Sequence, residues 1–374
     1  MSKNAIVIGA GIVGLATARA LVAKGFQVKV FERSSKAVGA SIRNFGMVWP
    51  IGQPEGTMLN RAMRSREIWK DVAKAANIWH DECGSIHLAY HADEQLVLTE
   101  LYEIFTTQGR AVQLLSPAEI NSKYNGINTN GLLCGLYSDS EMIVNSPKAI
   151  PAVASFLAKG LAVQFYWDMA ISRIETGKVF CGNTIFEADL IVLCSGVDFE
   201  TLFPASFSNV SITKCKLQMM KFVHQDPNFR INTSVCGGLS LIHYTSFQAD
   251  NSLAVLKKRY QLDYPEYIAN GIHVMVSQND DGELIVGDTH EYGLTFDPFD
   301  RVHLNKYVLD YLATFMHISD WKLTQTWNRI YPKMTDGKTE VFLNPLKDVY
   351  AINGVGGAGM TLSFGLAEEL IQSI

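Results

Sequence analysis

The first residues whose spacing suggests chemistry are three glycines near the N-terminus, Gly9, Gly11 and Gly14, followed by a carboxylate, Glu32. In a Gly-x-Gly-x-x-Gly motif the first glycine permits a tight turn and the second lets the backbone approach a pyrophosphate. The third glycine lets a helix lie close against a strand. Glu32, eighteen residues after Gly14, is placed to accept a hydrogen bond from a ribose hydroxyl. The motif therefore predicts dinucleotide binding; the alternative is a glycine turn with a purely structural role.

A second loop, residues 39–50, combines glycines with polar side chains. Ser41 is placed to cap a short helix that runs through Arg43 and Asn44. An arginine and a helix N-terminus would give a diphosphate a second set of donors. The pair Gly46-Met47 would let the backbone lie against a flat ring. The alternative is an ordinary surface loop.

A third glycine-rich loop, Gly354 to Gly359, precedes Met360, Thr361 and a helix over residues 362–374. It is the second glycine turn in the chain that leads into a helix N-terminus. A single pyrophosphate needs only one glycine turn of this kind. A cofactor with a pyrophosphate and also a ring that can carry negative charge needs both.

Apolar patterning predicts the elements that hold these loops. The pattern predicts a buried strand at residues 4–8, a helix at residues 15–24 that ends at Gly25, and a second strand at residues 27–31. The run from Ala188 to Gly196 reads as a central parallel strand whose end, at Ser195 and Gly196, faces a ligand. The chain is therefore predicted to form part of the nucleotide domain, then a different domain, and then the nucleotide domain again.

The intervening segments follow a different pattern. We expect strands at 84–90, 131–137, 215–223, 272–276, 284–286 and 327–331, and helices at 59–76, 93–108, 146–159 and 304–315. An Asp280-Asp281-Gly282 turn is expected to join two of the strands as a hairpin. The absence of a βαβ crossover in these segments predicts a separate, more antiparallel domain.

A chain of 374 residues favours two domains. We predict a discontinuous cofactor domain of residues 1–80, 146–212 and 334–374, and a substrate domain of residues 81–145 and 213–333. The sequence holds no pattern from which an oligomeric state follows.

Composition narrows the class of protein. A net charge of −5 gives no basic footprint for nucleic acid, and Lys257-Lys258-Arg259 reads as a solvated strand or turn end. The six cysteines form no CxxC pair and no metal-binding spacing. The spacing of His80, His87 and His91 gives no obvious pair of metal ligands with a third, so we expect exposed or core roles for them and no metal site. No stretch approaches the ~20 apolar residues of a membrane span, and we expect a cytoplasmic protein.

With these motifs in order, the chain resembles the D-amino-acid oxidase-like family of FAD-dependent oxidoreductases, the glycine and sarcosine oxidase group. The resemblance rests on the first glycine motif with Glu32, residues 40–47, residues 188–196 and residues 354–361. It implies an α/β and α+β fold, in which a Rossmann-like FAD-binding domain is interleaved with a mixed or antiparallel-sheet substrate domain. No cysteine follows Cys236, so the C-terminal cysteine linkage of some members is missing and non-covalent FAD is expected.

The resemblance also assigns residues to the cofactor. By resemblance, Glu32 and Arg33 lie at the adenosine ribose, the loop of Ser41 near the pyrophosphate, and the last glycine loop at the pyrimidine end of the flavin. The full set is Gly9, Gly11, Ile12, Val13, Gly14, Glu32, Arg33, Ser41, Arg43, Asn44, Gly46, Met47, Val163, Ser195, Gly196, Gly356, Gly357, Gly359, Met360 and Thr361.

The resemblance implies two-electron oxidation of a C–N bond in a small anionic amine. Tyr331 occupies the position at which family members commonly carry a carboxylate-binding arginine, while Arg329 lies two residues earlier on the same face of a strand. Arg329 either takes over that role or belongs to the scaffold. His243, Tyr244 and Lys216 are further candidates for substrate binding. Residues 43–54 also resemble a subgroup proposed to oxidise aminophosphonates.

Two other functions stay open at this point. The N-terminal motif alone would also suit an NAD(P)-dependent dehydrogenase. A non-catalytic or tRNA-modifying FAD-binding relative would hold the flavin without oxidising a free amine.

Overall fold

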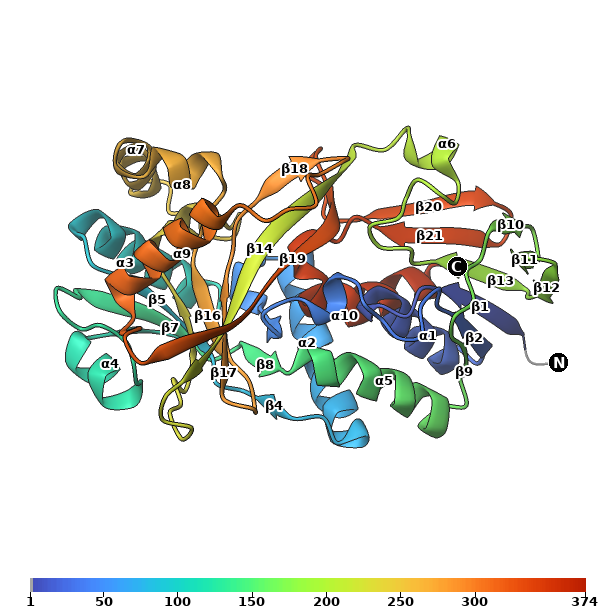
Figure 1. The fold of residues 1–374 in the computed structure, drawn as a ribbon, viewed down its shortest axis with the longest axis horizontal. Helices are drawn as coiled ribbons and strands as arrows, with labels where there is room; N and C mark the ends of the chain where they lie inside the picture. The colour runs from blue at the N-terminus through green and yellow to red at the C-terminus, as the bar shows by residue number, and fades with distance from the viewer. Residues whose placement is uncertain (1–2) are drawn as a thin grey trace.

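The strand that precedes the first glycine motif, β1 (Asn4–Ile8), lies inside a six-stranded sheet of order β20-β21-β13-β1-β2-β9. The computed structural model describes residues 3–374, and this sheet forms one half of an elongated molecule (Figure 1). β1 pairs in parallel with β2 and β13, and an antiparallel edge strand, β20, closes the side next to β21. The other strands are β2 (Gln27–Phe31), β9 (Gln164–Tyr166), β13 (Leu190–Leu193), β20 (Val341–Leu346) and β21 (Val349–Asn353).

Helices cover one face of this sheet and a small sheet covers the other. The helices are α1 (Ile12–Ala23), α2 (Thr57–Ala76), α5 (Ser146–Gly160) and α10 (Gly359–Gln372). Their apolar faces bury Leu15, Trp69 and Phe364 in one core, as burial of apolar surface requires. A second core, which includes Ile6 and Ile191, lies beneath a three-stranded sheet of β10 (Arg173–Glu175), β11 (Lys178–Cys181) and β12 (Thr184–Glu187).

A nine-stranded, mostly antiparallel sheet forms the other half, in the order β18-β14-β17-β16-β15-β5-β7-β6 with β19 paired to β14. β14 (Ile212–His224) and β19 (Trp321–Met334) make a long antiparallel ribbon through the middle of the molecule (Figure 1). The others are β5 (Ser85–Ala89), β6 (Val112–Leu115), β7 (Cys134–Ser138), β15 (Ser234–Cys236), β16 (Met275–Gln278), β17 (Glu283–Gly287) and β18 (Glu291–Gly293).

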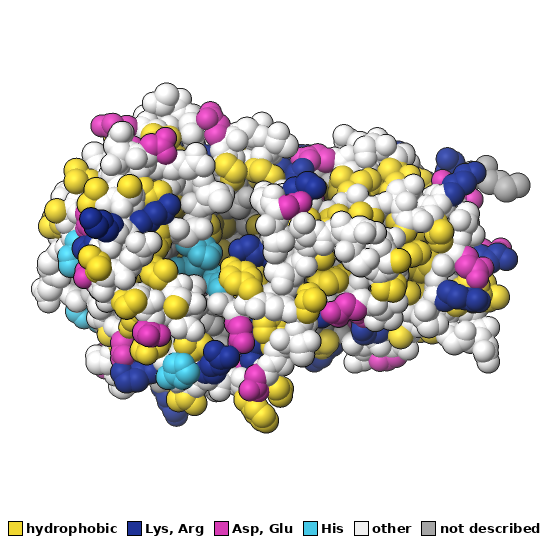
Figure 2. Space-filling view, turned by 90° about the horizontal axis from the view of Figure 1, so that it is seen from above, with side chains coloured by type: hydrophobic (Ala, Val, Ile, Leu, Met, Phe, Trp, Pro, Cys, Tyr) yellow, Lys and Arg dark blue, Asp and Glu magenta, His cyan; other side chains and the backbone are white. Residues whose placement is uncertain are grey.

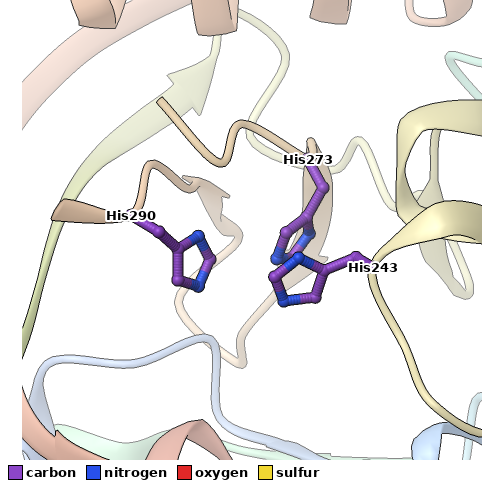
Figure 3. Close-up of side chains that lie close together, drawn as sticks. All are labelled: His243, His273 and His290. Carbon is purple, nitrogen blue, oxygen red and sulfur yellow. The ribbon is translucent and has the colours of Figure 1, made fainter. Parts of the chain in front are cut away.

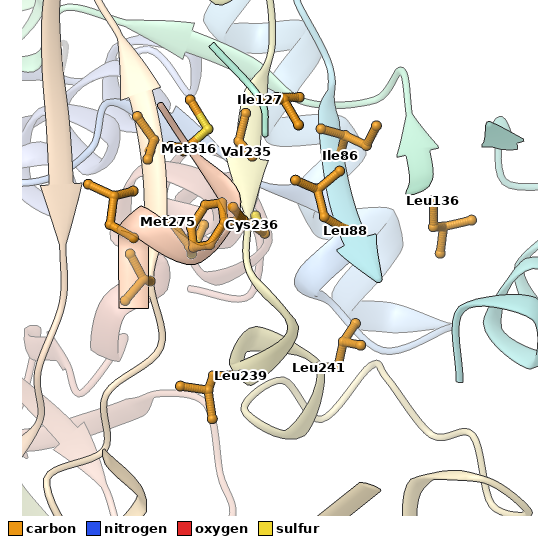
Figure 4. Packing of buried hydrophobic residues seen from close by; sticks show 14 of the residues in the cluster. Ile86, Leu88, Ile127, Leu136, Val235, Cys236, Leu239, Leu241, Met275 and Met316 are labelled. Carbon is orange, nitrogen blue, oxygen red and sulfur yellow. The ribbon is translucent and has the colours of Figure 1, made fainter. Parts of the chain in front are cut away.

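Helices pack against this second sheet around a large apolar core, part of which is drawn in Figure 4. Ile86, Leu88, Val235 and Leu239 belong to it and are almost completely buried. The helices of this half are α3 (Ala92–Thr107), α4 (Pro117–Lys123), α7 (Leu253–Asp263), α8 (Pro265–Ala269) and α9 (Val302–Phe315).

Short elements connect the halves. The remaining strands β3 (Met47–Val48), β4 (His80–Asp81) and β8 (Met142–Val144) form a third small sheet. The remaining helices are α6 (Pro204–Phe207) and the 3₁₀ turns η1 (Ala40–Ile42), η2 (Pro50–Gly52), η3 (Gly238–Ile242) and η4 (Gly356–Ala358).

The predicted fold class is confirmed: a parallel nucleotide sheet is interleaved with a mixed sheet that is mostly antiparallel. The interpretation of Lys257-Lys258-Arg259 as a strand or turn end is wrong, because these residues lie within α7. Arg259 is not simply solvated: it pairs with Asp93 at 2.6 Å and with Glu94 at 2.8 Å. Its charge therefore anchors α7 to α3, a tertiary contact that local composition does not reveal. The predicted domain boundaries stay a prediction.

Two statements about residues 3–374 complete the description. All six cysteines are free thiols. Among these residues, no helix combines the length and the apolar character that crossing a membrane requires.

The first glycine motif brings three backbone segments closer than side chains would permit. A Cβ atom on Gly9 would lie 2.3 Å from the carbonyl oxygen of Cys194, and one on Gly14 would lie 1.9 Å from that of Gly9. Gly9 also has a φ of +108°, which L residues rarely adopt. The contact between α1 and the ends of β1 and β13 thus requires glycine.

Replacing Gly14 tests this contact. We expect Gly14→Ala to lower the free energy of unfolding by about 1–3 kcal/mol, because the new methyl group forces α1 away from the turn. Gly293→Ala is the control, since the nearest contact of its Cβ atom would be an ordinary 3.5 Å. Urea denaturation measures both variants; equal unfolding midpoints would contradict the packing argument.

Candidate functional site

A cavity of about 540 Å³ opens at the carboxyl ends of β1, β2 and β13. Ligands bind at this edge of open α/β sheets. Gly9, Gly11, Glu32, Ser195 and Gly196 all line it. The cavity therefore brings together the first glycine motif and the end of the predicted central strand.

Glu32 is held rigidly at the end of β2. Its Oε2 accepts a hydrogen bond from the Ala10 N–H at 2.9 Å, and its Oε1 accepts one from the Ser34 N–H at 3.1 Å. The neighbouring Arg33 forms an ion pair with Asp198 at 2.6 Å across the cavity rim. A carboxylate fixed in this way keeps acceptor capacity for a ribose hydroxyl.

The second loop packs directly against the first. Ser41 lies inside the short turn η1, whose cap residue is Gly39, so the predicted capping role of Ser41 within its own loop is wrong. The Ser41 hydroxyl instead accepts a hydrogen bond from the N–H of Ile12, the first residue of α1, at 2.9 Å. Because Gly11 has no side chain to cap α1, a serine from a distant loop does so.

Arg43 and Asn44 organise the loop through backbone contacts. Asn44 donates to the carbonyl oxygens of Ala40 and Ser41, and its Oδ1 accepts from the Gly46 N–H at 2.7 Å. Arg43 donates to the carbonyl oxygen of Asn328 at 3.1 Å, which ties this loop to β19. Burial, and secondarily Arg329, lower the pKa of Arg43.

A second cavity of about 270 Å³ lies between the last glycine loop and the antiparallel sheet. It shares part of its wall with the first cavity, and the shared residues are Asn44, Arg329, Tyr331, Val355, Gly356, Gly357 and Met360. Thr361 joins the second loop to the start of α10, since its hydroxyl accepts from the Trp49 N–H at 2.9 Å. The two cavities meet where the three predicted cofactor segments converge.

FAD fits this arrangement. The first cavity presents glycine backbone and the N-terminus of α1 for a pyrophosphate, and Glu32 for a ribose. The backbone of Gly356 and Gly357, with the N-terminus of α10, lies where a ring that carries negative charge would be stabilised.

Arg329 and Asp288 form a buried pair in the second cavity. Nη2 of Arg329 lies 3.5 Å from Oδ2 of Asp288, and among residues 3–374 the Arg329 Nε has no hydrogen-bond partner. Burial raises the pKa of Asp288, although His290 and Arg329 oppose the shift. Tyr331, on the same face of β19, is also buried, and burial raises the pKa of its phenol. Arg329 thus retains donor capacity toward a ligand.

Three histidines gather in the same cavity. One ring nitrogen from each of His243, His273 and His290 lies within 4.8 Å of the other two, and the rings face a common space (Figure 3). Viewed from above, cyan histidine side chains are visible in a hollow near the middle of the molecule, beside a dark blue basic side chain (Figure 2). His273 and His290 lie beside His243, the sequence-predicted candidate.

The predicted residues divide between the two cavities. Those that line the first are Gly9, Gly11, Ile12, Val13, Glu32, Arg33, Ser41, Arg43, Asn44, Ser195, Gly196, Gly356, Gly357, Gly359 and Met360. Those that line the second include Met47, Thr361, His243, Tyr244, Arg329 and Tyr331. Their roles toward a ligand stay predictions.

Four candidates line neither cavity. Gly14 and Gly46 pack against backbone, with φ +78° at Gly46, and Val163 is buried in the core beside the helices. Lys216 points elsewhere, because its Nζ donates to the carbonyl oxygens of Asp297 and Phe299. Burial of its ammonium group against these acceptors makes Lys216 a loop anchor.

Sequence reasoning missed His273, Asp288, His290 and Lys333, which all line the second cavity. One signal was available. In the predicted hairpin, Met275 pairs with Gly287 in antiparallel register. His273, two residues before Met275, therefore lies opposite the segment just after Gly287, which carries Asp288 and His290. Without a fixed register this pairing is not apparent from sequence.

Comparisons with known proteins agree with this geometry. A family model described as FAD dependent oxidoreductase (DAO) matches residues 4–373. The structure of glycine oxidase from Bacillus cereus is similar, with a TM-score of 0.79 and 16% identity over 99% of this chain and 95% of that one. L-Proline dehydrogenase from P. horikoshii has a TM-score of 0.80 and 19% identity over 99% of this chain and 92% of that one.

Sequence similarity to curated proteins is more limited. A tRNA 5-methylaminomethyl-2-thiouridine biosynthesis bifunctional protein from Azoarcus sp. is 26% identical over 216 residues, which are 54% of this chain and 33% of that protein. The chain therefore matches only about a third of that relative's length.

Glu32 offers a test of the first cavity. We expect Glu32→Ala to reduce bound FAD after purification, with an affinity loss of about tenfold or more, because it removes the ribose acceptor and leaves the Ala10 N–H without its partner. The exposed Glu187 provides the control Glu187→Ala. Flavin absorbance per protein chain measures the effect; full FAD occupancy and unchanged affinity in Glu32→Ala would contradict the assignment.

Proposed function

The chain belongs to the DAO family of FAD-dependent oxidoreductases, and we propose that it oxidises a C–N bond in a small amine that carries an anionic group. The family match over residues 4–373 establishes FAD as the cofactor, so the nicotinamide-dependent alternative is not retained. The names of the structural neighbours, a glycine oxidase and an L-proline dehydrogenase, support an amine or amino acid as the substrate class.

One observation carries the proposal. A small cavity of about 270 Å³ shares a wall with the FAD cavity and contains a buried arginine whose Nε is unpartnered. A buried guanidinium with free donor capacity suits a carboxylate or another oxyanion. A cavity of this size suits a small molecule, and the shared wall supports binding of that molecule next to the cofactor.

FAD, when bound, supplies the acceptor for the hydride that leaves the carbon next to nitrogen. The residues of the chain bind and orient the substrate. Arg329 holds its anion, and Tyr331, on the same strand, forms part of the wall shared by the two cavities. A substrate that arrives as the neutral amine needs no strong protein base, and its imine product hydrolyses in water.

The last glycine loop has an electrostatic role in this proposal. Its backbone N–H groups and the N-terminus of α10 favour negative charge at the ring end of the cofactor. No acidic side chain lies in the first turn of α10 to oppose this effect. Residues 354–361 would thereby stabilise the reduced cofactor through fixed dipoles.

The substrate itself belongs to one of three classes: a glycine- or sarcosine-like amino acid, a D-amino acid, or an aminophosphonate. The resemblance of residues 43–54 to an aminophosphonate-associated subgroup favours the third class. A relative that binds FAD without oxidising a free amine is the alternative, and partial similarity to a tRNA-modifying protein is the observation behind it.

Anaerobic mixing of the purified holoenzyme with an amine panel tests the proposal. We expect glycine, sarcosine, a D-amino acid or 2-aminoethylphosphonate to bleach the oxidised flavin absorbance, because hydride transfer reduces the ring. Dithionite reduction is the control that the flavin is competent. Flavin that dithionite reduces but that no member of the panel bleaches would contradict amine oxidation within these classes.

Arg329 is the residue whose replacement separates a substrate-binding role from a scaffold role. We expect Arg329→Ala to raise KM by about 10- to 100-fold while the FAD content stays unchanged, because a charge-assisted hydrogen bond to the substrate anion is lost. Arg329→Lys keeps the charge opposite Asp288 but not the planar donor pair, so we expect an intermediate KM.

Arg301→Ala is the matched control, since the Arg301 side chain is exposed and forms a surface ion pair with Glu291 at 3.3 Å. Steady-state kinetics and flavin content are measured for all three variants. Unchanged KM in Arg329→Ala would assign Arg329 to the scaffold.

A further inference from the structure

We propose that His243, His273 and His290, together with Lys333, form a binding site for a tetrahedral oxyanion that carries two negative charges, and that the histidine cluster takes up a proton when this anion binds. The ligand class is a phosphonate or a phosphate ester. The inference rests on the proposed function in one respect: the oxyanion is taken as the anionic head group of the amine substrate, which Arg329 and the histidine cluster bind together.

The geometry of the cluster is the first argument. The three histidines come from separate segments: His243 follows η3, His273 precedes β16 and His290 precedes β18. Their ring centroids are 3.8 Å apart for His243 and His273, 4.8 Å for His243 and His290, and 5.2 Å for His273 and His290. Three segments thus direct imidazole rings into one space (Figure 3).

Unused hydrogen-bonding capacity is the second argument. His290 makes a 2.8 Å hydrogen bond from Nδ1 to the carbonyl oxygen of Gly271, which leaves its Nε2 available. Among residues 3–374, Nδ1 of His273 is buried without a hydrogen-bond partner, and Nε2 of His273 lies 3.2 Å from Oδ1 of Asp288. Within residues 3–374, the His243 ring makes no side-chain hydrogen bond. Buried polar groups are rarely left in this state unless a ligand completes them.

The protonation state of the free site is the third argument. Burial lowers the pKa of His290 to about 3, and burial with nearby charges lowers those of His243 and His273 well below the usual range. Lys333 contributes to this lowering for all three rings. The free cluster is therefore neutral near pH 7, and each ring can gain a proton if negative charge arrives.

Neutral imidazoles also suit a metal ion, since a ligating histidine commonly donates its second N–H to a carbonyl oxygen. The fixed charges of the cavity distinguish a metal ion from a dianion as the ligand. Arg329, Lys333 and Lys338 line it as cations, whereas Asp288 is the single carboxylate among the described lining residues. A divalent cation would add to this positive excess, and a dianion offsets it.

The other ionisable groups around the histidines also favour a negatively charged ligand. The other charged or ionisable side chains that line the cavity or stack on its histidines are Tyr244, Asp288, Tyr292, Arg329, Tyr331, Lys333 and Lys338. Asp288 is already engaged with Arg329 at 3.5 Å. Lys333 donates to the Tyr292 hydroxyl at 3.1 Å and holds its charge beside the rings.

The pH dependence follows from the direction of the shift. A bound dianion raises the pKa of the imidazoles above its value in the free protein, so binding takes up a proton between these two values. Affinity is therefore highest below the pKa of the free imidazole, falls by about tenfold per pH unit between the two values, and levels off above the pKa of the complex. A monoanion raises the imidazole pKa less and gives a weaker dependence.

Calorimetric titration of the holoenzyme with sodium sulfate tests the proposal. Sulfate is tetrahedral and keeps both charges near neutral pH, so any proton taken up enters the protein. Titrations in two buffers of different ionisation enthalpy count these protons. We expect about one proton per bound sulfate, and binding about tenfold or more tighter than that of methanesulfonate or acetate.

Histidine variants locate the site. We expect His273→Asn and His290→Asn to weaken sulfate binding by about tenfold and to lose the proton uptake. His303→Asn, on the exposed surface of α9, is the matched control and should bind sulfate like the parent. His243→Asn, at a half-buried position, is a second variant if the buried replacements fail to fold. Flavin content and the unfolding temperature report on folding.

Three results would overturn the proposal. The first is equal affinity for sulfate, methanesulfonate and acetate. The second is sulfate binding without proton uptake, or with uptake that persists in the folded histidine variants. The third is a stoichiometric metal ion in the purified holoenzyme that disappears in these variants, which would make the cluster a cation site.

Flavin reduction separates the source of the oxyanion and the two proposals. Reduction by 2-aminoethylphosphonate alone identifies a phosphonate, and reduction by O-phosphoethanolamine alone identifies a phosphate ester; either supports the dianion site. Proton-coupled sulfate binding without reduction by any amine supports the site and removes the proposed function. Reduction by glycine in a protein that does not bind sulfate keeps the proposed function and overturns the dianion site.

Discussion

The close approach of backbone at the first glycine motif is the constraint on which the rest of the structure depends. At Gly9 and Gly14, any side chain would collide with main-chain oxygen atoms, at 2.3 and 1.9 Å. Because these contacts are possible, α1 starts directly above β1, and its N-terminus, at which Gly11 offers no capping side chain, faces the cavity. Ser41 then reaches that N-terminus from the second loop, so one backbone contact positions two cofactor segments.

The long ribbon of β14 and β19 links this nucleotide half to the second cavity. Arg329, Tyr331 and Lys333 alternate along β19, and all three line the second cavity because alternate residues of a strand share a face. The same strand holds the second loop through the hydrogen bond from Arg43 to the Asn328 carbonyl oxygen. One strand thereby connects the flavin-binding loops with the residues that would select a substrate.

The two cavities differ in how their polar groups are satisfied. In the first, Glu32 and Asn44 each make several hydrogen bonds to backbone atoms, which fix the positions of their side chains. In the second, Arg329, Asp288 and His273 keep buried atoms without partners. Such atoms are unfavourable in the free protein and gain hydrogen bonds when a polar ligand enters. The unpartnered atoms in the second cavity support the proposal that a polar substrate binds there.

The sequence by itself determined the parallel sheet, the three glycine-bearing loops and the return of the chain to the first half. These features follow from local rules: apolar runs, glycine spacing and helix starts act over a few residues. Only the tertiary structure decided that Ser41 caps α1, that Arg259 anchors α7 to α3, and that His273, Asp288 and His290 join His243. These contacts join residues far apart in the chain or depend on strand register, and no local pattern encodes register or distance. The class of cofactor could therefore be predicted from the sequence. The charged groups that gather in the second cavity could be identified only from the fold.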